Sequence, residues 1–256
     1  MTPYPALFLG HGSPMNAIEP NRFHLEWRAL GQALPRPKAI LCVSAHWETH
    51  GIRVSSASHP ETIHDFGGFP QALFDVVYPA AGSPELAERT AQLLAGFGAT
   101  LDPDRGLDHG SWGLLTALYP DADVPVVQLS LDRDRTPQQH YDIAKALRPL
   151  RDEGIMILAS GDIVHNLRAI NFRNPTPIDW GVRFNEQVKD LIRRGQHQPL
   201  IDYLDLGQDA ALSINSAEHY LPLLYTLGVS DPDEALRFVT DEVVAAISMT
   251  GIIYGG

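Results

Sequence analysis

Histidines in short stretches flanked by glycine or serine are the residues of this sequence that could do chemistry. The chain has 11 histidines, and five of them stand out: His11 in "GHGS", His46 in "SAHWE", His109 in "DHGSW", His165 in "DIVHN" and His219 in "SAEHY". Taken singly, each could be a hydrogen-bonded packing residue. The glycines on both sides of His11 let the backbone approach a bound species closely, which a packing residue would not require. Because imidazole nitrogens are common metal ligands, we expect at least three of the five to bind one metal ion together.

The elements that would position these histidines are apolar runs alternating with amphipathic stretches. Strands are predicted at Ala6–Leu9, Ala39–Ser44, Ile52–Ser55, Val124–Leu129, Ile155–Ala159, Leu236–Val239 and Ala246–Met249. Helices are predicted at Arg22–Ala33, Glu85–Leu94, Pro137–Leu150, Gly181–Arg193 and Ala217–Leu227. Strands rich in Val, Ile and Leu between helices indicate an α/β fold. We expect a single domain over residues 1–256, with a central mixed, largely parallel β-sheet flanked by helices on both faces.

The predicted strands bring several histidines to one edge of this sheet. In open α/β folds, ligands bind at the carboxyl ends of the strands. His11 follows the first predicted strand, His46 the second and His165 the fifth, while His109 lies in a glycine-rich loop that leads into another apolar segment. We therefore expect these four residues to converge, although they are far apart along the chain.

Two of the histidines follow a possible helix cap at the same spacing. Asp162 precedes His165 by three residues, and Ser216 precedes His219 by three. If Asp162 and Ser216 are N-caps, each histidine lies in the first turn of a helix, where the helix dipole disfavours an imidazolium. Such a ring stays neutral near pH 7, and a neutral ring is what a metal ion needs.

Composition excludes several classes of partner. The formal net charge is −12, and no cluster of Lys and Arg marks a nucleic-acid surface. No apolar run approaches the roughly 20 residues of a membrane span, and the N-terminus does not resemble a signal peptide.

The single cysteine, Cys42, lies in an apolar run and is expected to fill the core. One cysteine cannot form a disulfide within the chain, so a reducing cytoplasm is the expected location.

Motifs of other catalytic classes are missing from the sequence. There is no G-x-S-x-G elbow, no phosphate loop, no G-x-G-x-x-G fingerprint and no H-E-x-x-H. Of the remaining histidines, His64 stands beside Asp65 and a Gly-Gly pair and is a candidate for lining the pocket. The others are predicted to lie at the surface: His24, His50, His59, His140 and His197.

Seven ordered motifs together resemble one known family. They are "LFLGHGSPMN", "VSAHWE", "TIHDFGGFP", "LDHGSWG", "VPVVQLS", "ASGDIVHNL" and "EHYLPLLY", and they cover nearly the whole chain. The sequence resembles the class III extradiol ring-cleaving dioxygenases, in the branch similar to 4,5-DOPA dioxygenase. The resemblance implies a small aromatic diol of the catechol type that binds at a non-haem metal ion and is opened by dioxygen next to the diol.

Matched motif by motif, the resemblance also implies roles for individual residues. His11 and His46 match two metal ligands of the family. His165 matches the acid–base histidine beside the metal, a role that calls for a pKa near neutrality. His109 matches a second active-site histidine that would hydrogen-bond the substrate or oxygen. Ser13, Asp65 and Asn166 could each support the metal ligands from behind, or could simply form a turn or a cap. The sequence leaves both alternatives open.

The third ligand departs from the better-known members of the superfamily, which use a glutamate. Here Glu218 and His219 stand side by side, and neighbours in a helical turn point about 100° apart, so both cannot easily reach one ion. The branch favours His219, with His165 close enough to be a fourth nitrogen ligand. We expect one divalent ion per chain. Fe(II) is expected for dioxygenase activity, whereas an all-histidine face also suits Zn(II), which has no redox chemistry.

Two other functions remain open at this point. A zinc-dependent hydrolase would use metal-bound water as the nucleophile and His165 as its base. A metal-binding scaffold of the same fold would have no turnover. The sequence specifies neither the natural catechol nor the oligomeric state.

Overall fold

The computed structural model describes residues 3–171 and 175–255. Its strands are β1 (Ala6–Gly10), β2 (Ala39–Thr49), β3 (Arg53–Ser55), β4 (Thr100–Asp102), β5 (Val126–Asp132), β6 (Ile155–Gly161), β7 (Leu236–Val239), β8 (Val243–Val244), β9 (Ile247–Ser248) and β10 (Gly251–Tyr254). Its α-helices are α1 (Arg22–Ala33), α2 (Gln71–Phe74), α3 (Pro84–Leu93), α4 (His109–Leu118), α5 (Pro137–Leu147), α6 (Pro149–Asp152), α7 (Asp179–Arg193), α8 (His197–Ile201), α9 (Gln208–Ser213) and α10 (Leu221–Val229).

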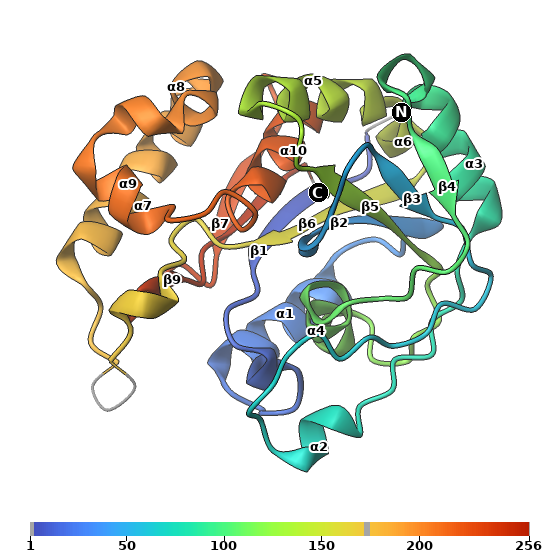
Figure 1. Cartoon of the computed structure of the whole chain (residues 1–256), viewed down its shortest axis with the longest axis horizontal. Helices are drawn as coiled ribbons and strands as arrows, with labels where there is room; N and C mark the ends of the chain where they lie inside the picture. The colour runs from blue at the N-terminus through green and yellow to red at the C-terminus, as the bar shows by residue number, and fades with distance from the viewer. Residues whose placement is uncertain (1–2, 172–174, 256) are drawn as a thin grey trace.

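Eight of these strands form one mixed sheet in the order β4-β3-β5-β2-β6-β1-β10-β7. The four central strands β5, β2, β6 and β1 are parallel to one another. On one side β10 pairs antiparallel with both β1 and β7, and on the other side β3 pairs antiparallel with β5. Figure 1 shows helices on both faces of this sheet. The predicted α/β fold with a mixed, largely parallel sheet is confirmed.

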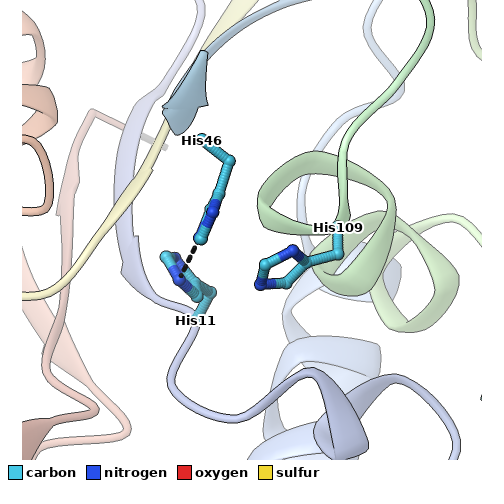
Figure 2. Close-up of side chains that lie close together, drawn as sticks. All are labelled: His11, His46 and His109. Carbon is cyan, nitrogen blue, oxygen red and sulfur yellow. Dashed lines mark hydrogen bonds between the residues drawn. The ribbon is translucent and has the colours of Figure 1, made fainter. Parts of the chain in front are cut away.

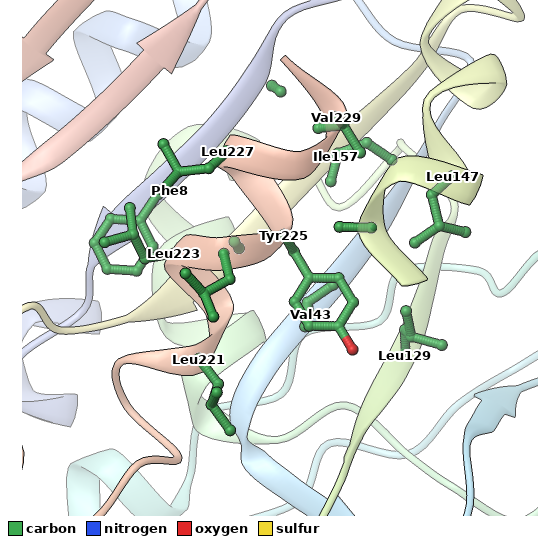
Figure 3. Packing of buried hydrophobic residues seen from close by; sticks show 14 of the residues in the cluster. Phe8, Val43, Leu129, Leu147, Ile157, Leu221, Leu223, Tyr225, Leu227 and Val229 are labelled. Atoms are coloured by element: carbon green, nitrogen blue, oxygen red, sulfur yellow. The ribbon is translucent and has the colours of Figure 1, made fainter. Parts of the chain in front are cut away.

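Both faces of the central strands are buried, which explains why they read as continuous apolar runs. In β1, Ala6 and Phe8 pack on one face with residues of α5 and α10, while Leu7 and Leu9 pack on the other with residues of α1 and α4. Figure 3 shows the first of these cores, where side chains of α10 lie against Phe8 and Ile157. The sheet is thus a rigid layer that can hold residues at its carboxyl edge in fixed positions.

Several predicted elements have the expected bounds and caps. Helix α1 and strand β7 coincide with their predictions. Thr136 and Gln139 form a capping box at the start of α5, and Ser83 caps α3. The prediction of one helix over Pro137–Leu150 is wrong. Helix α5 ends at Leu147, and the short helix α6 begins at Pro149, because a proline cannot continue the preceding helix.

The prediction for the end of the chain is partly wrong. The stretch Ala246–Met249 contains only the two-residue strand β9, which pairs with β8 in a small hairpin outside the main sheet. Strand β10 (Gly251–Tyr254), which was not predicted, pairs with β1 instead. Two short apolar runs compete here, and their tertiary pairing decides which of them joins the sheet.

The predicted caps at Asp162 and Ser216 are wrong. His165 lies in extended backbone that bridges to Ile214 and Ile247, and no helix begins at Asp162 in the described part of the chain. Helix α10 begins at Leu221, so His219 lies in the turn before it. The helix dipole therefore does not explain why the rings of His165 and His219 are neutral. Their burial explains it instead.

One predicted surface histidine is in the core. His140 is fully buried in α5, and its Nδ1 lies 3.0 Å from the hydroxyl of Tyr225 in α10. This pair joins the two helices across the core.

None of the helices in the described ranges is long and apolar enough to cross a membrane. The longest, α7, has 15 residues, fewer than a span requires.

Candidate active site and metal centre

The five predicted histidines meet at the carboxyl ends of the central parallel strands. His11 comes directly after β1, and His165 and His219 flank the end of β6, where Asp162 N–H donates to the carbonyl of His219. His46 lies within β2 and not after it as predicted. It falls in the stretch between Val43 and Glu48 where the register of β2 with β5 is irregular, and such irregularities re-aim side chains.

His109 comes from a helix and not from the predicted loop. It is the first residue of α4, and Asp108 caps that helix by accepting from the backbone N–H of Ser111. Asp108 is buried and also accepts from the hydroxyl of Ser44 in β2 at 2.7 Å and from Arg105 at 2.6 Å. These bonds fix the start of α4 against β2, which places the ring of His109 beside that of His46.

The rings of the cluster are at distances that suit a shared ion. Ring centroids of His11, His46 and His219 are 5.0, 5.1 and 5.2 Å apart. The ring of His109 lies 3.9 Å from that of His46. Figure 2 shows His11, His46 and His109 pointing toward one another. Within residues 3–171 and 175–255, three combinations of side chains have ligand atoms within 4.8 Å of one another: His11–His46–His109, His11–Asp162–His219 and His165–Glu218–His219.

Hydrogen bonds at Nδ1 fix which nitrogen of His11 faces the cluster. Nδ1 of His11 lies 3.1 Å from the hydroxyl of Ser160, and that hydroxyl donates to the carbonyl of Gly110. Because the hydroxyl proton is used there, Ser160 accepts from His11, whose Nδ1 therefore carries the proton. The lone pair of His11 is then on Nε2.

Carboxylates occupy the same position on the other rings. Asp65 lies 3.3 Å from Nδ1 of His46 and 2.9 Å from Nδ1 of His109, and Glu218 lies 3.0 Å from Nδ1 of His219. A ligating histidine typically donates its second ring N–H to such a partner. The arrangement thus leaves Nε2 of four rings, those of His11, His46, His109 and His219, free to bind an ion or a proton.

The contact between His11 and His46 tests whether the site fits a metal ion. Their Nε2 atoms are 3.1 Å apart (Figure 2), and the partners at Nδ1 place a lone pair on each. Two lone pairs at this distance repel unless a cation lies between them. With metal–nitrogen bonds of about 2.0–2.1 Å, two nitrogen ligands of one ion are about 2.9–3.4 Å apart. The residues therefore fit a metal ion.

Asp162 gives a second indication that the site suits a cation. It is buried, its Oδ1 accepts from the backbone N–H of Gly12 at 3.1 Å, and its Oδ2 has no hydrogen-bond partner within the described ranges. That Oδ2 lies 3.6 Å from Nε2 of His11. Burial raises the pKa of Asp162 well above its ordinary value. An unpaired buried carboxylate is costly, and a cation beside His11 would stabilise it.

Burial keeps three of the rings neutral: those of His11, His165 and His219. It lowers the pKa of His11 and His219 well below the ordinary value of histidine, and the neighbouring rings add to the effect. Burial also lowers the pKa of His165 to about 4, although Glu218 opposes this shift. That pKa is lower than the near-neutral value expected for acid–base catalysis, and an anionic substrate beside the ring would raise it.

A cavity of about 460 Å³ opens beside the cluster. His46 and His219 line it together with residues of both charges: Glu48, Arg105, Arg133 and Glu218. Its volume suits a small molecule that carries polar groups. His64, a candidate for lining the pocket, instead hydrogen-bonds the carbonyl of Val76 and packs against aromatic rings: Phe66, Phe74 and Trp112.

The sequence did not single out Ser160 or the role of Glu218 at the site, and it left Asp65 undecided. Ser160 lies in an apolar strand where a serine looks like a small core residue, and only the parallel register of β1 with β6 brings it beside His11. The only signal for Asp65 and Glu218 was that each stands next to a histidine in sequence.

Gly161 supports the position of His219 and yields a testable prediction. A Cβ on Gly161 would lie 2.2 Å from the carbonyl oxygen of His219, a backbone atom that cannot move cheaply. We expect Gly161→Ala to destabilise the protein by about 1–3 kcal/mol and to weaken zinc binding. Thermal denaturation and zinc titration measure both effects. Gly113→Ala in α4 is the control, since its Cβ would meet no atom within 4 Å. Equal behaviour of the two variants would contradict the prediction.

Comparison with known sequences identifies the family. The family model described as the catalytic LigB subunit of aromatic ring-opening dioxygenase matches residues 5–255. A protein of Escherichia coli strain K12 named 4,5-DOPA dioxygenase extradiol is 49% identical over 260 residues, which cover 99% of this chain and 96% of that protein. A Beta vulgaris protein of the same name is 38% identical over 239 residues, covering 91% of this chain and 89% of its own length.

Comparison with solved structures agrees. The crystal structure of an uncharacterized protein from Escherichia coli K12 matches with a TM-score of 0.87 and 43% sequence identity, and the match covers 98% of this chain and 100% of that one. The chain therefore belongs to the family of the catalytic LigB subunit of aromatic ring-opening dioxygenases, and it is an extradiol dioxygenase of the 4,5-DOPA dioxygenase-like branch.

Proposed function

We propose that the chain uses dioxygen and one divalent metal ion to open a catechol-type, DOPA-like ring next to the diol. The observation that carries the proposal is the pair of facing Nε2 atoms of His11 and His46, 3.1 Å apart, each on a ring whose Nδ1 has its own partner. Family members generally use a metal ion, and the histidine cluster could bind one. Residues 1–256 would act as one catalytic domain, and the single, buried cysteine suits a cytoplasmic protein.

His219 is the proposed third ligand in preference to Glu218. The Glu218 carboxylate accepts from Nδ1 of His219 and from the hydroxyl of Ser216 at 2.9 Å. A carboxylate in that position orients a ligating imidazole and raises its basicity. Glu218 then acts on the ion through His219.

His165 is proposed to transfer protons. Its ring stacks on that of His219 with centroids 3.5 Å apart and an interplanar angle of 10°. A ligating nitrogen points at its ion within the plane of the ring, so two rings stacked this closely cannot both be aimed at one ion. As long as the stack persists, His165 is better placed to accept a proton from the substrate than to be a fourth ligand.

Each residue then has a defined task in catalysis. A bound Fe(II) would supply Lewis acidity and redox chemistry, whereas Zn(II) would supply only the first. His165, neutral near pH 7, accepts a proton from one hydroxyl of the diol and later returns it to oxygen. Nε2 of His109 faces the same space and can hydrogen-bond the second hydroxyl. The product would be a ring-opened muconic semialdehyde.

Controlled metal loading tests the proposal. Protein loaded with Fe(II) without oxygen, then given L-DOPA and air, is expected to form a yellow ring-fission product and to consume one dioxygen per ring opened. The zinc-loaded protein should form none. A folded, iron-loaded protein without product would refute the proposal, and cleavage of esters or amides by the zinc form would favour a hydrolase.

A further inference from the structure

Asp65 touches two histidines of the cluster with one carboxyl group. Its Oδ1 accepts from both the backbone N–H and the ring Nδ1 of His109, at 3.0 and 2.9 Å. Its Oδ2 lies 3.3 Å from Nδ1 of His46. An aspartic acid side chain is ordinarily ionised near pH 7. Here a backbone N–H donates to Oδ1, and a ring nitrogen faces each of the two oxygens, so the geometry is that of a carboxylate that accepts from three N–H groups.

A carboxylate can only accept hydrogen bonds, and this determines the tautomer of both rings. Nδ1 of His46 and Nδ1 of His109 must each carry a proton to interact with Asp65. Both rings then have their lone pair on Nε2. For His46 that lone pair faces Nε2 of His11, where the ion is proposed to bind. For His109 it is available to accept a proton.

We propose that Asp65 is a positioning residue that makes His46 an Nε2 metal ligand and His109 an Nε2 proton acceptor. The inference deepens the proposed function and rests on it for the role of His109. A catechol has two hydroxyl protons, and His165 accounts for one. The second would move from the hydroxyl oxygen to Nε2 of His109. The imidazolium that forms keeps its Nδ1–H bond to Asp65, which stabilises the new charge.

Replacement by asparagine separates this role from a simple packing role. Asparagine has the same shape but offers one acceptor oxygen and one NH₂ donor. The backbone N–H and the ring N–H of His109 converge on one oxygen, so the amide oxygen stays there and the NH₂ faces His46. Nδ1 of His46 must then accept, which puts its proton on Nε2 and blocks the lone pair that would bind the ion.

Metal affinity of Asp65→Asn is the first measurement. We expect zinc affinity, measured by competition with a chromophoric chelator, to fall by about 10–100-fold, as when a partner of a ligating histidine is lost. Asp75→Asn is the matched control, because Asp75 is an exposed carboxylate at the C-cap of α2 that bonds only Gln71 among the described residues. Wild-type affinity in a folded Asp65→Asn variant would overturn the proposal.

The tautomers themselves can be observed in the unmutated protein. Nitrogen-15 NMR of the zinc-loaded enzyme is expected to show His46 and His109 protonated at Nδ1, with Nε2 of His109 unprotonated. An Nε2–H tautomer of His109 would overturn the proposal even if the variant does not fold. Both measurements are made without catechol, so their outcome is independent of whether the chain opens an aromatic ring.

Discussion

Replacement of His165 by alanine is expected to leave the metal content intact and to lower kcat for ring opening by about 10²–10⁴-fold, the usual contribution of a positioned acid–base group. His165 stacks on His219 and is not needed to hold the ion in the proposed arrangement. Burial makes its ring neutral near pH 7, so the nitrogen that should receive the substrate proton is available. Metal analysis and steady-state oxygen uptake of the iron-loaded variant measure the two effects.

His197→Ala is a suitable comparison for this variant. His197 is also partly buried, but its Nδ1 bonds the hydroxyl of Tyr141 outside the cluster. Full activity in His165→Ala would refute the acid–base role. Loss of the metal from the His165→Ala variant would instead identify His165 as a metal ligand. The stack of the His165 and His219 rings would then have to change when the metal binds.

The largest expected effect on the metal comes from His46. Replacing it by alanine removes one of the two facing Nε2 atoms and leaves Asp65 without one of its two partner rings. We expect affinity for zinc to fall by more than about 100-fold, a larger loss than that of a second-layer partner, and activity to disappear with it. Equilibrium dialysis against zinc and metal analysis after purification give the values.

His50→Ala controls for the loss of an imidazole near the same strand. His50 follows directly after β2, is exposed and pairs with Asp134 at the surface. The His50→Ala variant should bind zinc with the affinity of the unmutated protein. If His46→Ala also retained its metal, the proposed ligand set would be wrong, and His11 with Asp162 and His219 would be the next combination to test.

The central strands and the position of His11 could be predicted because apolar runs between turns leave a clear pattern. β1 and α1 follow it, and His11 directly after β1 needs no further information. His46 was placed after its strand because the prediction ended β2 at Ser44. The irregular pairing that extends β2 to Thr49 depends on β5 and leaves no mark in the local sequence.

Helix α4 shows why other parts of the site could not be predicted. Its sequence, "HGSWGLLTAL", is buried on nearly all sides, so it has no polar face to reveal a helical period, and its two glycines favour a loop reading. The sequence predicts His165 in a helix because Asp162 stands three residues before it, which is the spacing expected for an N-cap. In the structure, bridges to residues distant in sequence hold His165 in extended backbone, and the Asp162 side chain faces His11. Contacts of this kind arise only after folding.

The histidines proposed to hold the ion come from both ends of the chain, since His11 follows the first strand and His219 precedes the last helix. A bound ion would therefore act as a cross-link that closes most of the polypeptide into a loop. Because only the folded chain brings these nitrogens together, loading would stabilise it by about 2.7 kcal/mol at a free ion concentration one hundred times the dissociation constant. Metal supply would then govern the lifetime of the protein in the cell as well as its activity.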